Sequence, residues 1–184
     1  MRLLLPFLLF FIVSCSDNNK YEYILKEDNY KHNFKLNKEQ SFVDLEEGFT
    51  FYNAANQNSE KIPIVLIHGF SVPSYIWNPT YKMLKEKGFY VISIDLYGRG
   101  NSKNIDGDYT DELFANQVLQ LLNHLNIDKA DFVGLSNGGR VISKIADTKP
   151  EIIGRLIYVA SSSFMKKTKA LVTDVSEREV REFI

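Results

Sequence analysis

The chain of 184 residues has one cysteine, three histidines and no excess of charge of either sign. Because Cys15 is the only cysteine, an intramolecular disulfide is excluded and packing must stabilise the folded part. The formal net charge is −1 and the one basic cluster lies at 166–169, so nucleic acid is not an expected partner. The sequence contains no internal repeat, no cluster of metal ligands and no glycine-rich phosphate loop, so we expect neither a metal nor a cofactor.

Long hydrophobic runs are absent except near the amino terminus, where Arg2 precedes an apolar run over 3–13. This run is too short to span a bilayer, and the layout is typical of a secretory signal. Residues 12–15 (IVSC) resemble the lipobox of bacterial lipoproteins, in which the cysteine is acylated and becomes the first mature residue. We therefore expect 1–15 to be a lipoprotein-type signal peptide and Cys15 to anchor the protein, secreted across the inner membrane, to a bacterial cell membrane. The alternative is an ordinary cleaved signal with an incidental cysteine.

Residues 16–38 are rich in Asp, Asn, Lys, Glu and Tyr and have no clean periodicity. This composition predicts a polar tether that holds a folded domain off a membrane, although its tyrosines would allow the later part to pack on that domain. His32 lies in this stretch and is expected to be solvated. The remaining residues, 39–184, are expected to form one domain.

From residue 39 onward, short apolar runs alternate with segments of helical periodicity. Runs at 41–45 and 49–53, separated by Glu-Glu-Gly, predict an antiparallel hairpin. Nearly continuous apolar runs predict buried parallel strands, and apolar stripes at helical spacing predict helices between them. These strands are expected at 62–67, 90–94, 130–135 and 153–159, and the helices at 80–87, 110–125 and 140–147. The order predicts an α/β domain, with a mostly parallel sheet and helices on both sides.

The stretch 130–147 carries the clearest chemical signal. Gly134, Ser136 and Gly138 form G-x-S-x-G between the predicted strand and helix, where a strained turn leaves no room for a β-carbon beside the serine. The serine hydroxyl would stand at the carboxyl end of the strand, above free N–H groups at the positive end of the helix. A turn whose serine only caps the helix has the same pattern, so the assignment depends on further motifs.

Three further motifs stand at the ends of predicted strands. His68-Gly69-Phe70 follows the strand at 62–67, with Trp77 a short distance later; DLYGRGNS follows the strand at 90–94; and Lys149-Pro150-Glu151 leads into the last strand. Together with the serine turn, these motifs resemble the α/β-hydrolase superfamily over about residues 40–160. The resemblance implies the α/β-hydrolase fold, in the branch that uses a serine nucleophile.

The resemblance also implies roles for single residues. Ser136 would be the nucleophile that forms an acyl-enzyme with a small-molecule acyl substrate, a carboxylic ester or a related bond. The backbone N–H groups of Phe70 and Asn137 would form the oxyanion hole. The family often has Met or Gln where this chain has Asn137.

Other titratable side chains are expected to have structural or solvent-facing roles. His68 would brace the oxyanion loop and not act as the base, and Asp95 would form hydrogen bonds to its own turn. His124 would face solvent beside Gln117 on the polar flank of its helix.

The chain departs from the family pattern after Ser136, because the family places an acid and then a histidine after the nucleophile and no histidine follows here. We therefore expect an incomplete α/β-hydrolase domain that stops after about six strands, with 161–184 as the start of a cap or lid. Thr173 or Asp174 would cap a last helix, and nothing marks Asp174 as a triad member. The expected consequence is that these 184 residues alone are inactive.

Two functions follow from these observations. The first is a secreted, lipid-anchored serine hydrolase of the esterase or lipase kind. The second is a non-catalytic, lipid-anchored member of the same fold that binds a small apolar ligand, which the missing histidine favours. The genomic sequence downstream of the Ile184 codon would distinguish the two.

Overall fold

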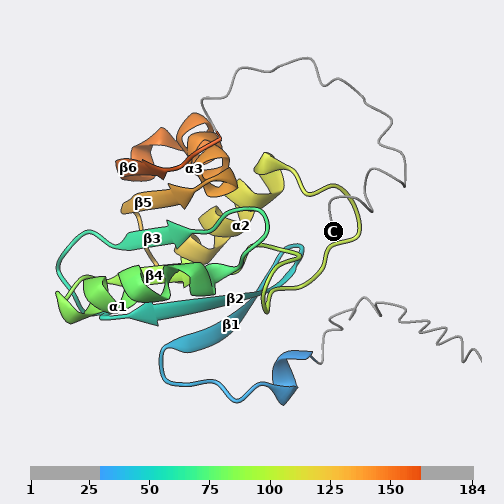
Figure 1. Cartoon of the computed structure of the whole chain (residues 1–184), viewed down its shortest axis with the longest axis horizontal. Helices are drawn as coiled ribbons and strands as arrows, with labels where there is room; N and C mark the ends of the chain where they lie inside the picture. Colours follow the sequence, from blue (N-terminus) through green and yellow to red (C-terminus); the bar gives the residue numbers. More distant parts are fainter. Residues whose placement is uncertain (1–29, 163–184) are drawn as a thin grey trace, which may run out of the picture.

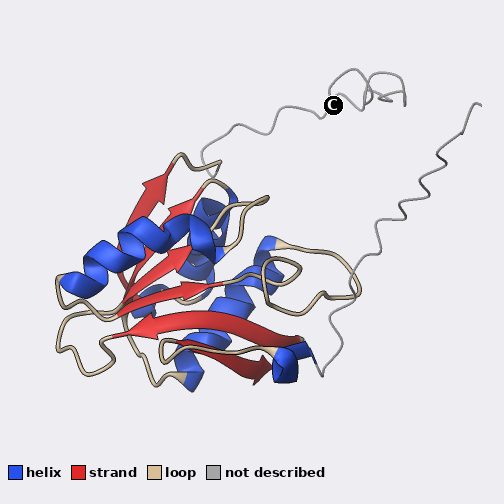
Figure 2. Ribbon diagram, turned by 60° about the horizontal axis from the view of Figure 1, so that its bottom comes forward, coloured by secondary structure: helices blue, strands red, loops and turns tan. Residues whose placement is uncertain are grey.

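The structure is a computed structural model that describes residues 30–162 (Figure 1). The predictions for the signal peptide, Cys15, the first part of the tether and the cap segment from residue 163 on, including Asp174, lie outside the described residues. Within 30–162, one sheet is covered by helices on both faces (Figure 2).

The sheet has six strands in the order β1-β2-β4-β3-β5-β6. Strands β1 and β2 form an antiparallel hairpin, β2 pairs antiparallel with β4, and the other pairs are parallel. This arrangement confirms the predicted mostly parallel sheet with an amino-terminal hairpin. The strands are β1 Gln40–Leu45, β2 Gly48–Ala55, β3 Ile64–Ile67, β4 Val91–Ile94, β5 Ala130–Leu135 and β6 Ile153–Val159.

Helices connect the parallel strands as the apolar stripes predict. The α-helices are α1 Asn78–Glu86, α2 Asp111–His124 and α3 Asn137–Thr148, and the 3-10 helices are η1 Tyr30–Asn33, η2 Ser74–Trp77 and η3 Pro150–Ile152. Strand β3 begins two residues later than expected because Pro63 has no N–H to donate to a neighbouring strand. Within 30–162, every helix is too short or too polar to span a bilayer.

The core lies on both faces of β3 and β4, whose residues are all buried. Helices α2 and α3 cover one face, where Phe114, Val118 and Ile142 pack against the sheet. Helix α1 covers the other face (Figures 1 and 2), where Trp77 also packs. Burying one such large side chain contributes about 1.5–3 kcal/mol, so the central strands fix the position of the loops at their carboxyl ends.

The segment that precedes β1 lies against the hairpin. The ring of Tyr30 stacks on Phe49 at a centroid distance of 6.1 Å, and its hydroxyl donates to Asn101 at 3.2 Å. Phe34 packs edge-on against Phe42 at 5.8 Å. The part of the predicted tether from Tyr30 onward is therefore in contact with the domain.

Strand β6 is the last strand of the described residues and forms one edge of the sheet. One of its faces packs on the core through Leu156 and Tyr158. On its other face Ile157 is 47% exposed and Val159 is 37% exposed. An apolar strand edge with an exposed face favours pairing with other chains.

We predict that residues 16–184, expressed alone, associate through this face of β6 and are largely insoluble. The substitution Ile157→Lys should raise the soluble monomeric fraction measured by size-exclusion chromatography, because it places a charge on the associating surface. Ile62→Lys is the matched control, since Ile62 is 42% exposed but lies outside the strands. A monomeric wild-type sample with a sharp cooperative melt would contradict the prediction.

Candidate active site

Ser136 lies between β5 and α3 with backbone angles φ 50° and ψ −112°. Residues with a side chain rarely adopt a positive φ, so the turn is strained. Hydrogen bonds hold it on both sides. The N–H of Ser136 donates to the carbonyl of Val159 at 2.9 Å, and the carbonyl of Ser136 accepts from the N–H of Gly139 at 3.1 Å.

The two glycines of the G-x-S-x-G motif allow the backbone segments around Ser136 to approach closely. A β-carbon on Gly134 would lie 2.5 Å from the carbonyl oxygen of Gly138. A β-carbon on Gly138 would lie 2.4 Å from the carbonyl oxygen of Ile67, at the end of β3. Both positions therefore require glycine for space, as the sequence motif indicates.

The loop after β3 lies directly against the serine. A β-carbon on Gly69 would be 3.2 Å from the β-carbon of Ser136 and 3.8 Å from its Oγ. Within residues 30–162 the backbone N–H groups of Phe70 and Asn137 have no protein acceptor. Asn137 is the first residue of α3, so its N–H belongs to the positive end of that helix.

Arg99 holds the Phe70 loop in place. Its Nε donates to the carbonyl of Phe70 at 3.0 Å, and its Nη1 donates to the carbonyl of Tyr97 at 3.3 Å. The guanidinium also lies over the ring of Phe70, 4.7 Å from the centroid. The sequence motifs predict no separate role for Arg99. Its place between Gly98 and Gly100, in a turn next to the His-Gly-Phe loop, is a signal that points to this contact.

His68 is fully buried, and both of its ring nitrogens are engaged. Its Nε2 accepts from the N–H of Leu96 at 3.0 Å, so the proton must be on Nδ1, which donates to the carbonyl of Gly69 at 2.7 Å. Burial lowers the pKa of His68, and the hydrogen bond to Gly69 and the charge of Asp95 oppose this in part. His68 is thus a neutral brace between two loops, and it has no free nitrogen with which to accept the serine proton.

Asp95 connects the turn after β4 to the start of η2. Its buried carboxylate accepts from the N–H of Ser74 at 2.7 Å and from the N–H of Asn101 at 2.8 Å. Its role as a turn-former, expected from the sequence, agrees with these contacts.

Gln117 corrects one prediction. The sequence placed it with His124 on a solvent-facing flank, but Gln117 is buried. Its side chain accepts from the N–H of Tyr97 at 3.0 Å and donates to Thr50 Oγ1 and to the carbonyl of Asp95. His124 is exposed, as predicted. It is the last residue of α2 and lies about 20 Å along the helix from Asp111, the first residue.

A cavity of about 400 Å³ opens beside Phe70 and Asn137. The rest of its wall consists of Thr110, two aromatic rings and three charged side chains, which are Tyr109, Phe114, Arg99, Arg140 and Asp111. Within residues 30–162, no group of three or more His, Cys, Asp or Glu side chains is placed to hold a metal ion.

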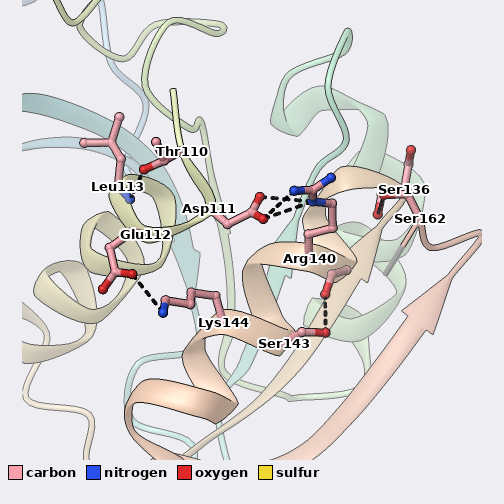
Figure 3. A network of polar contacts seen from close by, with 10 residues as sticks. Thr110, Asp111, Glu112, Leu113, Ser136, Arg140, Ser143, Lys144 and Ser162 are labelled. Carbon is pink, nitrogen blue, oxygen red and sulfur yellow. Dashed lines mark hydrogen bonds and ion pairs between the residues drawn. The ribbon is translucent and has the colours of Figure 1, made fainter. Parts of the chain in front are cut away.

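Two ion pairs join the start of α2 to α3 (Figure 3). Arg140 contacts the carboxylate of Asp111 through Nε and Nη2, at 2.7 Å for the shortest pair. Lys144, one turn further along α3, pairs at 2.8 Å with Glu112, the residue after Asp111 in α2. Only the Arg140–Asp111 pair lines the cavity.

The structure brings together the predicted nucleophile Ser136 and the predicted oxyanion residues Phe70 and Asn137. Cys15, the predicted lipid attachment site, lies outside the described residues.

Comparison with known proteins gives a consistent family. The sequence model of the alpha/beta hydrolase fold family matches residues 62–182. The solved structures of similar fold include carboxylesterases, an enol-lactonase and an epoxide hydrolase. A hydrolase from Pseudomonas aeruginosa superposes with a TM-score of 0.65 at 27% identity, over 72% of this chain and 49% of that one.

Two curated relatives show the range of the sequence similarity. An uncharacterised protein of Mycobacterium tuberculosis is 37% identical over 103 residues, which are 56% of this chain and 30% of that protein. The (E)-2-((N-methylformamido)methylene)succinate hydrolase of Acinetobacter baylyi is 26% identical over 122 residues, 66% of this chain and 45% of that enzyme. The chain therefore spans less than half the length of these relatives.

The burial of neutral His68 predicts a pH-dependent stability. The unfolded chain takes up a proton below the ordinary histidine pKa of 6.5, whereas the lowered pKa keeps native His68 neutral. The free energy of unfolding should therefore fall as the pH drops below about 6.5, by up to about 1.4 kcal/mol per pH unit from this group. Urea unfolding at several pH values measures this loss of stability. The free energy of unfolding of His68→Gln, which has no titratable group at this position, should fall less steeply as the pH drops. Equal slopes for the two proteins would contradict the prediction.

Proposed function

The chain belongs to the alpha/beta hydrolase fold family, and on that basis we propose that it is a serine hydrolase that cleaves a carboxylic ester or a related acyl bond. The observation that supports this most is the strained backbone of Ser136, at the end of β5, with the Gly69 loop packed against it. A strained turn of this kind is maintained where it exposes a nucleophile.

In the proposed reaction, Ser136 Oγ attacks the carbonyl carbon while a base removes the hydroxyl proton. The carbonyl oxygen becomes an oxyanion and accepts hydrogen bonds from the backbone N–H groups of Phe70 and Asn137. Each donor is expected to contribute about 3–4 kcal/mol to the transition state. The alcohol leaves with a proton, and water then hydrolyses the acyl-enzyme to release the acid and regenerate the serine.

The 184 residues supply this nucleophile and oxyanion hole without an evident base. No histidine follows Ser136 in the sequence. His68 is engaged through both ring nitrogens, and His124 is exposed at the distant end of α2. A serine hydroxyl is almost wholly protonated at neutral pH, so attack without a base is slow.

We predict that the product of the complete reading frame hydrolyses p-nitrophenyl esters and that Ser136→Ala lowers kcat by about 10⁶-fold. Ser143→Ala is the matched control, because Ser143 lies on α3 and bonds only to structural partners. Residues 16–184 alone should show no Ser136-dependent turnover. Rapid turnover by these residues that Ser136→Ala abolishes would contradict the absence of a base.

The alternative is a non-catalytic member of the fold that binds a small apolar ligand in the cavity beside Phe70 and Asn137. Phe70, Tyr109 and Phe114 line this cavity and give it the apolar surface that such a ligand would contact. This alternative takes precedence if a stop codon follows Ile184 in an intact gene and the protein has no Ser136-dependent activity.

We further propose that Cys15 carries a lipid and anchors the protein to a bacterial cell membrane. The support is the IVSC sequence at the end of the long apolar run near the amino terminus. Metabolic labelling with radioactive palmitate should tag the wild-type protein and not Cys15→Ala. Equal labelling of both proteins would refute the lipobox assignment.

A further inference from the structure

The cavity lined by Phe70 and Asn137, the residue after Ser136, carries more positive than negative charge. Its wall includes the guanidinium groups of Arg99 and Arg140 and the carboxylate of Asp111. Arg140 and Asp111 neutralise each other in a two-pronged ion pair. Arg99 donates instead to two neutral carbonyl oxygens, and within residues 30–162 no carboxylate forms an ion pair with it. Among the described residues, the charge of Arg99 therefore has no ion-pair partner.

That charge lies close to the proposed oxyanion hole. The same cavity is lined by Phe70 and Asn137. The rings of Phe70, Tyr109 and Phe114 lie 4.7, 5.2 and 5.7 Å from the guanidinium of Arg99. Aromatic neighbours reduce the access of water to the cation, which strengthens its attraction for an anion. They also offer an apolar wall to a short carbon chain.

We propose that this cavity selects esters that carry a second, ionised carboxylate, such as the monoester of a short dicarboxylic acid. The inference rests on the proposed function, because it places the ester carbonyl at Ser136. A guanidinium has five N–H groups, and among residues 30–162 only Nε and Nη1 of Arg99 and Nε and Nη2 of Arg140 donate to protein acceptors. The free carboxylate would bind the remaining N–H groups of these two side chains.

Two esters of the same shape test this selectivity. Monomethyl glutarate carries a carboxylate, and methyl glutaramate carries a neutral carboxamide in its place. For the product of the complete reading frame, kcat/KM should be about tenfold or more higher for the anionic ester, and added NaCl should reduce that ratio. Equal kcat/KM values would overturn the inference.

Two variants break the same ion pair with opposite electrostatic effects. Arg140→Gln removes a positive charge from the cavity and should lower the ratio of anionic to neutral kcat/KM several-fold. Asp111→Asn frees Arg140 and should raise that ratio. If the ion pair had only a structural role, both variants would change the ratio in the same direction.

The neighbouring ion pair provides the matched control. Lys144→Gln and Glu112→Gln break a pair that joins the same two helices outside the cavity (Figure 3). These variants should leave the ratio unchanged. A change as large as that of Arg140→Gln would show that helix packing, and not charge in the cavity, sets the selectivity.

The two proposals can fail separately. If hydrolysis depends on Ser136 but the ratio is close to one in every variant, the function stands and the selectivity is wrong. If neither these esters nor p-nitrophenyl esters are hydrolysed, the function is wrong, and calorimetric titration of the Ser136→Ala protein with both methyl esters decides the selectivity. Tighter binding of monomethyl glutarate by about tenfold would support it, and equal binding would overturn it.

Discussion

The site depends on the close approach of three backbone segments at the carboxyl edge of the sheet. These are the end of β3 with the loop that follows it, the turn at Ser136 and the start of α3. The start of α3 lies against the end of β3 because Gly138 has no β-carbon to meet the carbonyl of Ile67. The loop after β3 lies against Ser136 because Gly69 has none either. This approach sets the distance between the serine hydroxyl and the N–H groups around it. A side chain at Gly138 would force the backbone to shift.

Buried polar groups hold the surrounding loops in position. His68 links the Gly69 loop to the turn after β4, and Asp95 links that turn to η2. Gln117 joins the same turn to α2 and β2. Because these buried groups are paired, the loops place few polar atoms in the core without a hydrogen-bond partner, and several hydrogen bonds restrain each loop. Removing one partner would leave a buried donor or acceptor unpaired, which costs about 1–3 kcal/mol.

The sequence predicts most of the fold because the relevant signals are local. Apolar runs and helical stripes locate the strands and helices, and the spacing of Gly134, Ser136 and Gly138 locates the turn. The contacts of Arg99 and Gln117 depend on segments distant in sequence, so local patterns do not reveal them. Gln117 had one usable signal: it lies three residues after Phe114 and four before Leu121, which places it within the apolar stripe of α2. Its polar neighbours led to the opposite interpretation.

The central claim is that Ser136 is a nucleophile whose oxyanion is held by Phe70 and Asn137. A crystal structure of the product of the complete reading frame, after reaction with a fluorophosphonate, tests this claim most directly. The account predicts phosphorus bound to Ser136 Oγ, with the phosphonyl oxygen about 3 Å from the backbone nitrogens of Phe70 and Asn137. Attachment to another residue, or a phosphonyl oxygen turned away from both nitrogens, would contradict it.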